Sequence, residues 1–441
     1  MLVPASKRSS VALVFTLAFV ARSVISIHCE ERTAGLTGEI SGVPDPTLLP
    51  VASGQAPNVA AYSALNVPRQ PAGFSYNDPV TNVRIWKVTS STVPARNAGA
   101  GHDYADGSNQ VSLGWGADNS THTILIRGDG MAYYLVDFTR GVGFRNYRIL
   151  PPAAQPTGDL CFSFSNLASQ PRIAYVINGG QLKRFNTVTM QVENIGFFPL
   201  TTTLQTWLQH DRNDGWFVGL ANPTTAFAWN SQTNQLLAHA ESWLNEPRLE
   251  RDGRYVALTS GTSAIRLWDL PSNILGPTQR NASISFFHNA DLRGQWVGTD
   301  NNASSPFAQD RYYPSGGQIS KVQFLTQSAG AGVHHAGNWV QSDADVGGDL
   351  NRQWSFVSGF NYNNPLWTTS LLWQEAIGVE RSDGTDQRLL LHHYDPQIPL
   401  VYFSLPFGMP SPDGKVVIFN SNMNGALRYD LFVAEMPLRH R

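Results

Sequence analysis

The sequence has few charged residues, few lysines and few cysteines. Charged residues make up 15% of the 441 positions, well below the roughly 25% of ordinary soluble domains. Five lysines stand beside 26 arginines, and the formal net charge is −2. We therefore expect no basic field that would hold nucleic acid or an anionic membrane surface. Two cysteines allow at most one disulfide, which excludes a disulfide scaffold and a cysteine-rich zinc site.

Long apolar runs are also missing, with one exception near the N-terminus. Val11–Ala21 follows two basic residues and is too short to span a bilayer, which is the pattern of an export signal. We predict a signal peptide over residues 1–26, cleaved before Ile27, and a chain that is secreted or periplasmic. An uncleaved membrane anchor is the alternative. Residues 27–70 are rich in Gly, Pro, Ala and Ser, and we expect them to form a flexible leader.

Helical periodicity is absent from the remaining chain, where short runs of β-branched and aromatic residues take its place. One unit recurs, a turn of the Asp-Gly type followed by an apolar strand. Its clearest copies are Ser411–Phe419 (SPDGKVVIF) and Glu250–Leu258 (ERDGRYVAL). Seven such units follow one another at spacings of roughly 40–60 residues, which is the range of β-propeller blades.

Each unit can be divided into four short strands, as in residues 160–196. Four short antiparallel strands cannot bury both faces alone, so such blades must stack around an axis. The last unit supplies three strands, and Thr81–Ser91 (TNVRIWKVTSS) is expected to pair with it as the outer strand. The sequence therefore predicts an all-β fold over residues 71–441, a seven-bladed β-propeller of four-stranded antiparallel blades. An N-terminal strand that joins the C-terminal blade closes the ring.

Histidines recur on one type of connection in this division of the chain. In a propeller, the connection from the outer strand of one blade to the inner strand of the next leads to the mouth of the central channel, always on the same face. We place six of the eleven histidines there: His102, His288, His334, His335, His392 and His393. A lone histidine is more often structural, but six on equivalent connections indicate a shared site.

Such a site has two kinds of chemistry available to it. Neutral imidazoles can bind a divalent metal ion, for which three or four suffice. They can also transfer protons near neutral pH, and Tyr104, two residues after His102, adds a phenol that can do the same. The sequence has no phosphate-binding loop, Gly-x-Ser-x-Gly elbow, His-Glu-x-x-His motif or dinucleotide fingerprint, which disfavours those enzyme classes.

The C-terminal stretch Arg381–Gly425, with "RLLLHHYDPQIPLVYFSLPFGMPSPDGKVVIF" inside it, resembles the last blades of oligogalacturonate lyases and, more distantly, of ulvan lyases. The blade pattern of the whole mature chain is similar to that superfamily. The resemblance implies cleavage of uronate-containing polysaccharide by β-elimination, in which a base removes the C5 proton and a cation neutralises the carboxylate.

The resemblance to the oligogalacturonate lyases implies roles for five histidines. His288 resembles the base, and His334 or His335 resembles a ligand of a manganese ion. That family places a Gln and two His just before the final Ser-Pro-Asp-Gly turn, where this chain has Leu405–Pro410. His392 and His393 are the substitute ligands, provided that their loop bends to the axis.

The resemblance to the ulvan lyases points to other residues. His102 and His122 resemble their two early histidines, and Arg184 resembles their arginine. No tyrosine matches their tyrosine base, so Tyr104 is a candidate only through its position beside His102.

Two functions follow as expectations. The first is a secreted propeller that acts on uronate-containing polysaccharide, as a β-eliminating lyase with a histidine-lined site at the channel mouth and a bound divalent metal, Mn or Ca. The alternative is a non-catalytic propeller that binds a glycan or a protein partner. For both we expect a monomer with no nucleic-acid partner and no membrane attachment after signal cleavage.

Overall fold

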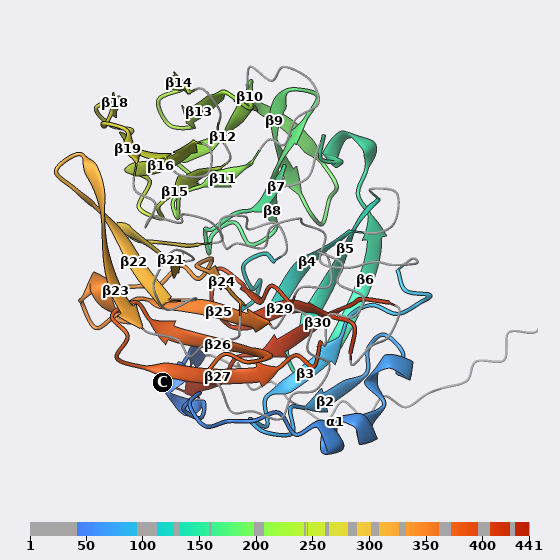
Figure 1. Cartoon of the computed structure of the whole chain (residues 1–441). Coiled ribbons are helices and arrows are strands. Elements are labelled where there is room, and N and C mark those ends of the chain that lie inside the picture. The colour runs from blue at the N-terminus through green and yellow to red at the C-terminus, as the bar shows by residue number, and fades with distance from the viewer. Residues whose placement is uncertain are drawn as a thin grey trace, which may run out of the picture. The chain divides into compact units, whose positions relative to one another are not determined.

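The computed structural model describes most of the chain from residue 42 onwards (Figure 1). The described ranges are 42–94, 113–127, 132–157, 161–197, 207–241, 244, 246–260, 264–280, 289–300, 308–325, 332–360, 372–395, 406–423 and 428–440. All of them belong to one compact unit, Ile40–Arg441.

Within these ranges, seven antiparallel sheets form the blades of a propeller, as predicted. Blades 1 and 2 contain β4 (Thr121–Arg127), β5 (Tyr133–Thr139), β6 (Gly143–Ile149), β7 (Phe162–Phe164), β8 (Ile173–Asn178), β9 (Gln181–Asn186) and β10 (Val192–Phe197). Blades 3 and 4 contain β11 (Gln209–His210), β12 (Trp216–Asn222), β13 (Thr225–Asn230), β14 (Leu236–Ala240), β15 (Pro247–Leu249), β16 (Tyr255–Ser260), β17 (Ala264–Asp269), β18 (Ile274–Leu275) and β19 (Gln279–Arg280).

The remaining blades follow the same order from inner to outer strand. Blades 5 and 6 contain β20 (Ala290–Leu292), β21 (Gln295–Asp300), β22 (Ala308–Ser315), β23 (Gln318–Leu325), β24 (Gly332–Ala336), β25 (Trp354–Phe360), β26 (Ala376–Arg381) and β27 (Gln387–His392). Blade 7 contains β28 (Met409–Pro410), β29 (Val416–Ser421), β30 (Asp430–Glu435), β3 (Arg84–Lys87) and β2 (Ser75–Asn77). In blade 1, a single bridge from Leu113 to Ile124 takes the place of the inner strand.

The ring closes through its N-terminal strand, which confirms the prediction. β3 pairs antiparallel with β30, with Ile85 opposite Ala434 and Trp86 opposite Val433. This pairing covers the backbone edge that β30 would otherwise expose. A second pairing, between β1 (Gly42–Pro44) and β31 (Leu438–His440), also joins the two ends of this unit.

Residues 42–70, in the range expected to form a flexible leader, contain short elements that pack on blades 6 and 7. These are β1, η1 (Pro46–Leu48), α1 (Val59–Leu65) and η2 (Val67–Arg69). Tyr62 and Val67 are buried in a cluster with Trp354 and Phe419. Buried apolar side chains thus hold in place part of a stretch that its Gly and Pro content predicted to be flexible. The limits of signal peptide and leader stay predictions. Two further short helical turns are η4 (Pro152–Ala154) and η5 (Leu350–Arg352).

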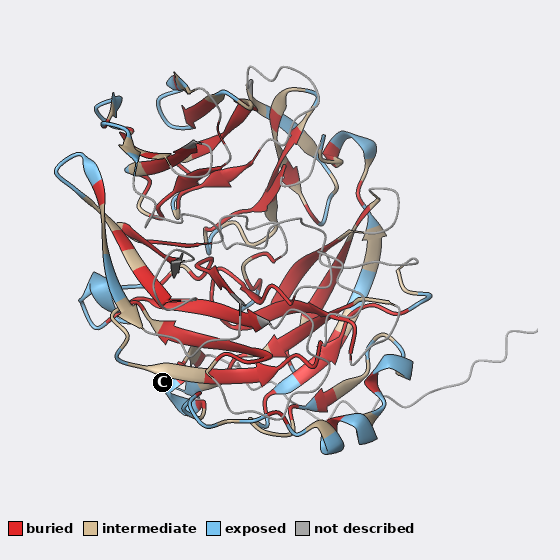
Figure 2. Cartoon of the chain, viewed as in Figure 1, coloured by how far each residue is buried: buried red, intermediate tan, exposed pale blue. Residues whose placement is uncertain are grey.

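The Asp-Gly turns of the repeat connect the inner strand of a blade to its second strand. Gly253 and Gly414 adopt φ values of +77° and +68° there, a region that favours glycine. The apolar strands that follow these turns are buried between blades, and Figure 2 shows the buried residues running along the strands of every blade. No helix among the described residues is long and apolar enough to cross a membrane.

Candidate functional site

The two ends of the propeller are formed by different kinds of strand connection. Connections in an antiparallel blade alternate between the ends, so every inner strand begins at one end and turns into the second strand at the other. We call the first the mouth end, where β15, β20 and β24 begin. The second is the turn end, formed by turns such as Glu250–Gly253 and Ser411–Gly414.

Three of the predicted catalytic residues lie outside the described residues. His102 and Tyr104 precede Leu113, the inner position of blade 1, and His288 precedes β20. Their predicted roles therefore remain predictions.

His122 is described, and it lies at the turn end. It belongs to β4, and its Nε2 is 3.0 Å from both carboxylate oxygens of Asp413, which lies in the turn between β28 and β29 of blade 7. The His122 and Asp413 side chains are 0% and 5% exposed. Burial raises the pKa of Asp413, but the charge and hydrogen bond of His122, with the hydrogen bond from Ser411, outweigh it and lower this pKa to about 2. The pair joins blades 7 and 1 and faces away from the mouth.

His334 and His335 lie on the inner strand β24 itself, not on the connection before it as the sequence suggested. Neighbouring residues of a strand point to opposite faces. The His334 ring packs 4.7 Å from the ring of Phe407 in blade 7. His335 points the other way, with Nε2 3.2 Å from Glu380 and 3.4 Å from Gln309 of blade 5. These two histidines therefore occupy separate blade interfaces.

His392 ends β27, the outer strand of blade 6, and His393 follows it; both are buried. Burial lowers the pKa of His392, an effect that Asp78 only partly offsets. His393 donates from Nε2 to the carbonyl oxygen of Gly359 at 2.7 Å and accepts at Nδ1 from the backbone of Asp395. Burial lowers the pKa of His393 to about 3, so this ring is neutral at neutral pH. Both imidazole rings are buried, and the loop that continues beyond Asp395 lies outside the described residues.

Arg184 also lies away from the mouth. It belongs to β9, the third strand of blade 2, and donates to Gln170 in the turn between β7 and β8 at 3.0 Å. The guanidinium is thus directed towards the turn end. Arg184 and His122 therefore both lie towards the turn end, and the catalytic roles that the resemblance implies for them stay predictions.

The described residues do not fit a histidine-held divalent metal. His334, His335, His392 and His393 occupy separate environments, and across the described ranges no group of three or more His, Cys, Asp or Glu side chains is placed to hold a metal ion. No chemical step is therefore derived through manganese or calcium.

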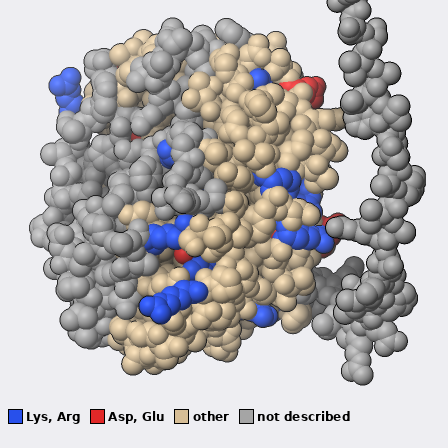
Figure 3. All heavy atoms as spheres, turned by 90° about the vertical axis from the view of Figure 1, so that its right-hand side faces the viewer, with Lys and Arg blue, Asp and Glu red and all other residues tan. Residues whose placement is uncertain are grey.

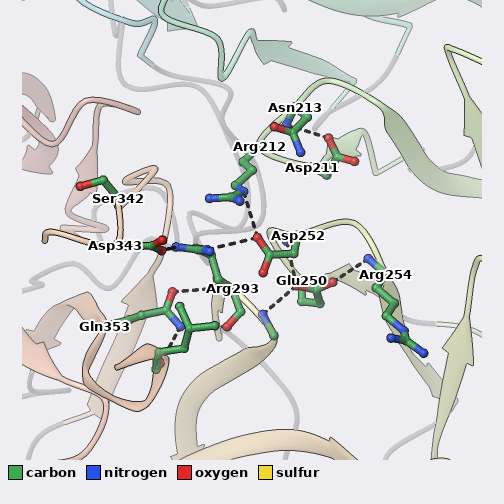
Figure 4. A network of polar contacts seen from close by, with 12 residues as sticks. Asp211, Arg212, Asn213, Glu250, Asp252, Arg254, Arg293, Ser342, Asp343 and Gln353 are labelled. Carbon is green, nitrogen blue, oxygen red and sulfur yellow. Dashed lines mark hydrogen bonds and ion pairs between the residues drawn. The ribbon is translucent and has the colours of Figure 1, made fainter. Parts of the chain in front are cut away.

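A network of ion pairs at the turn end was missed by the sequence analysis (Figure 4). Asp252 of blade 4 forms an ion pair with Arg212 of blade 3 at 2.9 Å and accepts a hydrogen bond from Arg293 of blade 5 at 3.2 Å. Arg293 also contacts Asp343 of blade 6 at 2.7 Å. The signal was present in the repeat, because charged residues of opposite sign occupy neighbouring positions of successive turns. This network joins four blades and leaves its charges paired.

Buried polar groups at the mouth end form a second cluster that the sequence did not reveal. Arg248 is fully buried on β15 and contacts Glu246 at 3.0 Å and Asp291 at 3.4 Å, so its charge is already compensated. Asn289, just before β20, is fully buried, and its side-chain amide has no hydrogen-bond partner in the described part of the chain. Gly298 leaves the space that this amide occupies. Asn289 directly follows His288, the predicted base, in the sequence.

Comparison with known proteins supports the fold. No protein-family model matches the chain, and no curated protein matches it. A solved oligogalacturonate lyase in complex with manganese superposes with a TM-score of 0.55 at 14% identity, over 83% of this chain and 97% of that one. An oligogalacturonate lyase from Vibrio parahaemolyticus gives 0.53 at 13% identity, over 82% and 96%. The predicted resemblance is confirmed at the level of architecture: this chain has the seven-bladed propeller fold that those lyases share.

Proposed function

We propose that this chain acts on uronate-containing polysaccharide at the mouth end of its propeller, by β-elimination. One observation carries the proposal. The fold matches that of an oligogalacturonate lyase over 97% of the lyase chain, so the whole ring is shared rather than a few blades. At 14% identity the match carries architecture only, and the chemistry has to be assigned to this chain's own residues.

β-Elimination needs a base for the C5 proton and a donor that stabilises the negative charge growing on the carboxylate. His288, followed by the unsatisfied amide of Asn289, is the proposed base. His102 and Tyr104, which precede the inner position of blade 1, are the proposed proton donors to the substrate. The described histidines are not assigned to the reaction, because His122, His335 and His393 are engaged between blades.

A second function is favoured by the contacts of His122, His335 and His393, which are engaged within the protein rather than free for a reaction. The alternative is therefore a non-catalytic module that binds a glycan through its mouth-end loops.

Product formation separates the two functions. The purified chain is incubated with polygalacturonate and with ulvan, with and without Mn²⁺ or Ca²⁺, and the ultraviolet absorbance of the unsaturated uronate is followed. We expect the wild type to form product from one of these polymers. The rate of product formation should fall strongly in His288→Ala and His102→Ala. It should stay unchanged in the matched control His440→Ala, whose histidine is exposed on β31. No product from any uronate polymer, together with retained binding on a glycan array, would establish the binding module instead.

Export is part of the proposal. We propose that residues 1–26 direct secretion or transfer to the periplasm, because an enzyme for polymeric glycans must meet its substrate outside the cytoplasm. N-terminal sequencing of the protein recovered from the culture medium or periplasm should begin near Ile27. A product that retains Met1 in the cell interior would refute this.

A further inference from the structure

Positive charge is concentrated in one part of a chain that is acidic elsewhere. From the start of β6 to the end of β9, residues 143–186, the sequence has five Lys or Arg and one acidic residue, Asp159. This segment carries +4 in a chain of net charge −2, so the rest of the chain carries −6. Figure 3 views the molecule from the side on which β6 lies in Figure 1, and the described part of that face shows more Lys and Arg than Asp and Glu.

Three arginines gather around a single carboxylate at the junction of blades 1 and 2. Asp137 of β5 is 3.1 Å from Arg148 of β6 and 3.4 Å from Arg172 at the start of β8. Arg145 stands directly opposite Asp137 in the β5–β6 register, and it is exposed. No ion pair or hydrogen bond of Arg145 is present among the described residues. One negative charge therefore faces three positive ones.

The surface beside these arginines is hollowed. A hollow of about 350 Å³ is lined by Asp137, Asn146, Tyr147, Arg148 and Val188. A second, of about 570 Å³, shares Tyr147 and Arg148 and adds Tyr134 and Ile149. Val188 and Ile149 are 59% and 58% exposed. Guanidinium and amide groups thus alternate with aromatic and aliphatic surface along the outer edge strand of blade 1.

We propose that the outer edge of blade 1, formed by β6 with Arg145 and Arg148 and flanked by Arg172 of blade 2, is a binding surface for a polyanionic glycan whose sugars carry carboxylates. The inference rests on the proposed function, and it adds a second contact for the polymer. Arginine forks match the geometry of carboxylates. The rings of Tyr134 and Tyr147 offer the flat apolar faces on which sugar rings stack.

This surface is separate from the mouth of the channel. β6 is the outermost strand of its sheet, two strands beyond β4, which makes the inner bridge to Leu113. With neighbouring strands about 4.8 Å apart, the edge lies roughly 14 Å outward from that inner position. A polymer can therefore contact this edge while another part of it occupies the mouth, and the two contacts would raise its apparent affinity together.

The test compares two exposed arginines with the same charge change. Binding of polygalacturonate is measured by titration calorimetry for the wild type, Arg145→Glu and the control Arg280→Glu, whose arginine is exposed on blade 4. We expect Arg145→Glu to weaken binding about tenfold and to lower the salt dependence of Kd, with Arg280→Glu unchanged. Arg172→Gln, which keeps hydrogen-bond donors but loses the charge, should weaken binding in the same direction. Methyl-esterified polygalacturonate, which lacks the carboxylates, should bind poorly to every variant.

Three results would overturn the inference. They are equal weakening by Arg145→Glu and Arg280→Glu, equal binding of the methyl ester, and equally tight binding of a DNA oligonucleotide, which would indicate a general affinity for polyanions. Cleavage of trigalacturonate, too short to reach both contacts, is measured in parallel and should be unchanged in Arg145→Glu. If the wild type cleaves nothing but Arg145→Glu still weakens binding, the proposed lyase activity fails and the surface stands. If the wild type cleaves and Arg145→Glu binds normally, the surface fails and the activity stands.

Discussion

The contact between His122 and Asp413 predicts a pH-dependent part of the stability of the ring. Both side chains are almost fully buried, and Nε2 of His122 contacts both carboxylate oxygens at 3.0 Å. The pKa of Asp413 falls from its usual 3.8 to about 2. This lowering of the pKa on folding corresponds to roughly 2.5 kcal/mol of stability. This contribution is fully present above pH 4 and is lost as the pH falls towards 2, because the unfolded state takes up the proton near pH 3.8 whereas the folded state takes it up only near pH 2.

Asp413→Asn removes the charge while keeping the size of the side chain. We expect the free energy of unfolding to drop by about 3 kcal/mol at pH 7, because the variant leaves a buried histidine without its carboxylate. Ser411 also loses a charged acceptor, to which it donates at 2.6 Å. The asparagine does not titrate, so the gap between variant and wild type should narrow by about 2 kcal/mol between pH 5 and pH 2.

Urea unfolding followed by tryptophan fluorescence measures this gap at each pH. Asp343→Asn is the matched control, because the Asp343 side chain is 79% exposed and its ion pair with Arg293 is screened by solvent. A double-mutant cycle with His122→Gln isolates the coupling between the two side chains. A gap between wild type and Asp413→Asn that stays constant from pH 7 to pH 2 would refute the ion pair as its source.

Three further predictions concern the packing of blades. Arg248→Met leaves the carboxylates of Glu246 and Asp291 buried without this guanidinium. We expect the free energy of unfolding, measured in urea, to fall by about 3–5 kcal/mol. An unchanged urea midpoint would contradict the view that Arg248 compensates these two buried charges. Gly359→Ala would push a methyl group into the backbone carbonyl of Trp373, so we expect a loss of about 3 kcal/mol and a clear fall in Tm, whereas a native Tm would show that the turn at Trp373 can move away from β25 at little cost. Deletion of residues 1–90 removes β3 and exposes the edge of β30, so size-exclusion chromatography should show aggregates, and a monodisperse monomer would show that ring closure is dispensable.

The fold was predictable from the sequence because its information is local and repeated. The turn before β16 and the turn before β29 carry the same Asp-Gly pattern, and each needs glycine in the left-handed region at Gly253 and Gly414. The closing strand β3 was also predictable, since a blade with three strands implies a missing fourth. The packed elements of residues 42–70 were not, because only a few apolar side chains such as Tyr62 anchor them.

The positions of the histidines could not be predicted in the same way. A shift of one residue in a strand reverses the face on which a side chain lies. His334 and His335 therefore contact different blades, although they are neighbours in sequence. His122 finds its partner 291 residues away, in a motif whose sequence suggests only a turn. Strand boundaries and pairing partners decide these contacts, and neither is encoded by the spacing of histidines alone.

The same geometry explains where chemistry can be located on this scaffold. Side chains of the inner strands point towards neighbouring blades, because the strand edge rather than its face borders the channel. Titratable groups on the inner strands and in the turns that follow them are engaged in contacts between blades, as Asp291 of β20 and Asp413 of the β28–β29 turn show. Groups that are free to meet a ligand must then come from the connections at the mouth end or from the outer edge strands. His102 and His288 belong to the first category by sequence, and Arg145 belongs to the second by structure. A substrate long enough to touch both would be held at two places by one ring, which is the arrangement that the binding experiment on Arg145 examines.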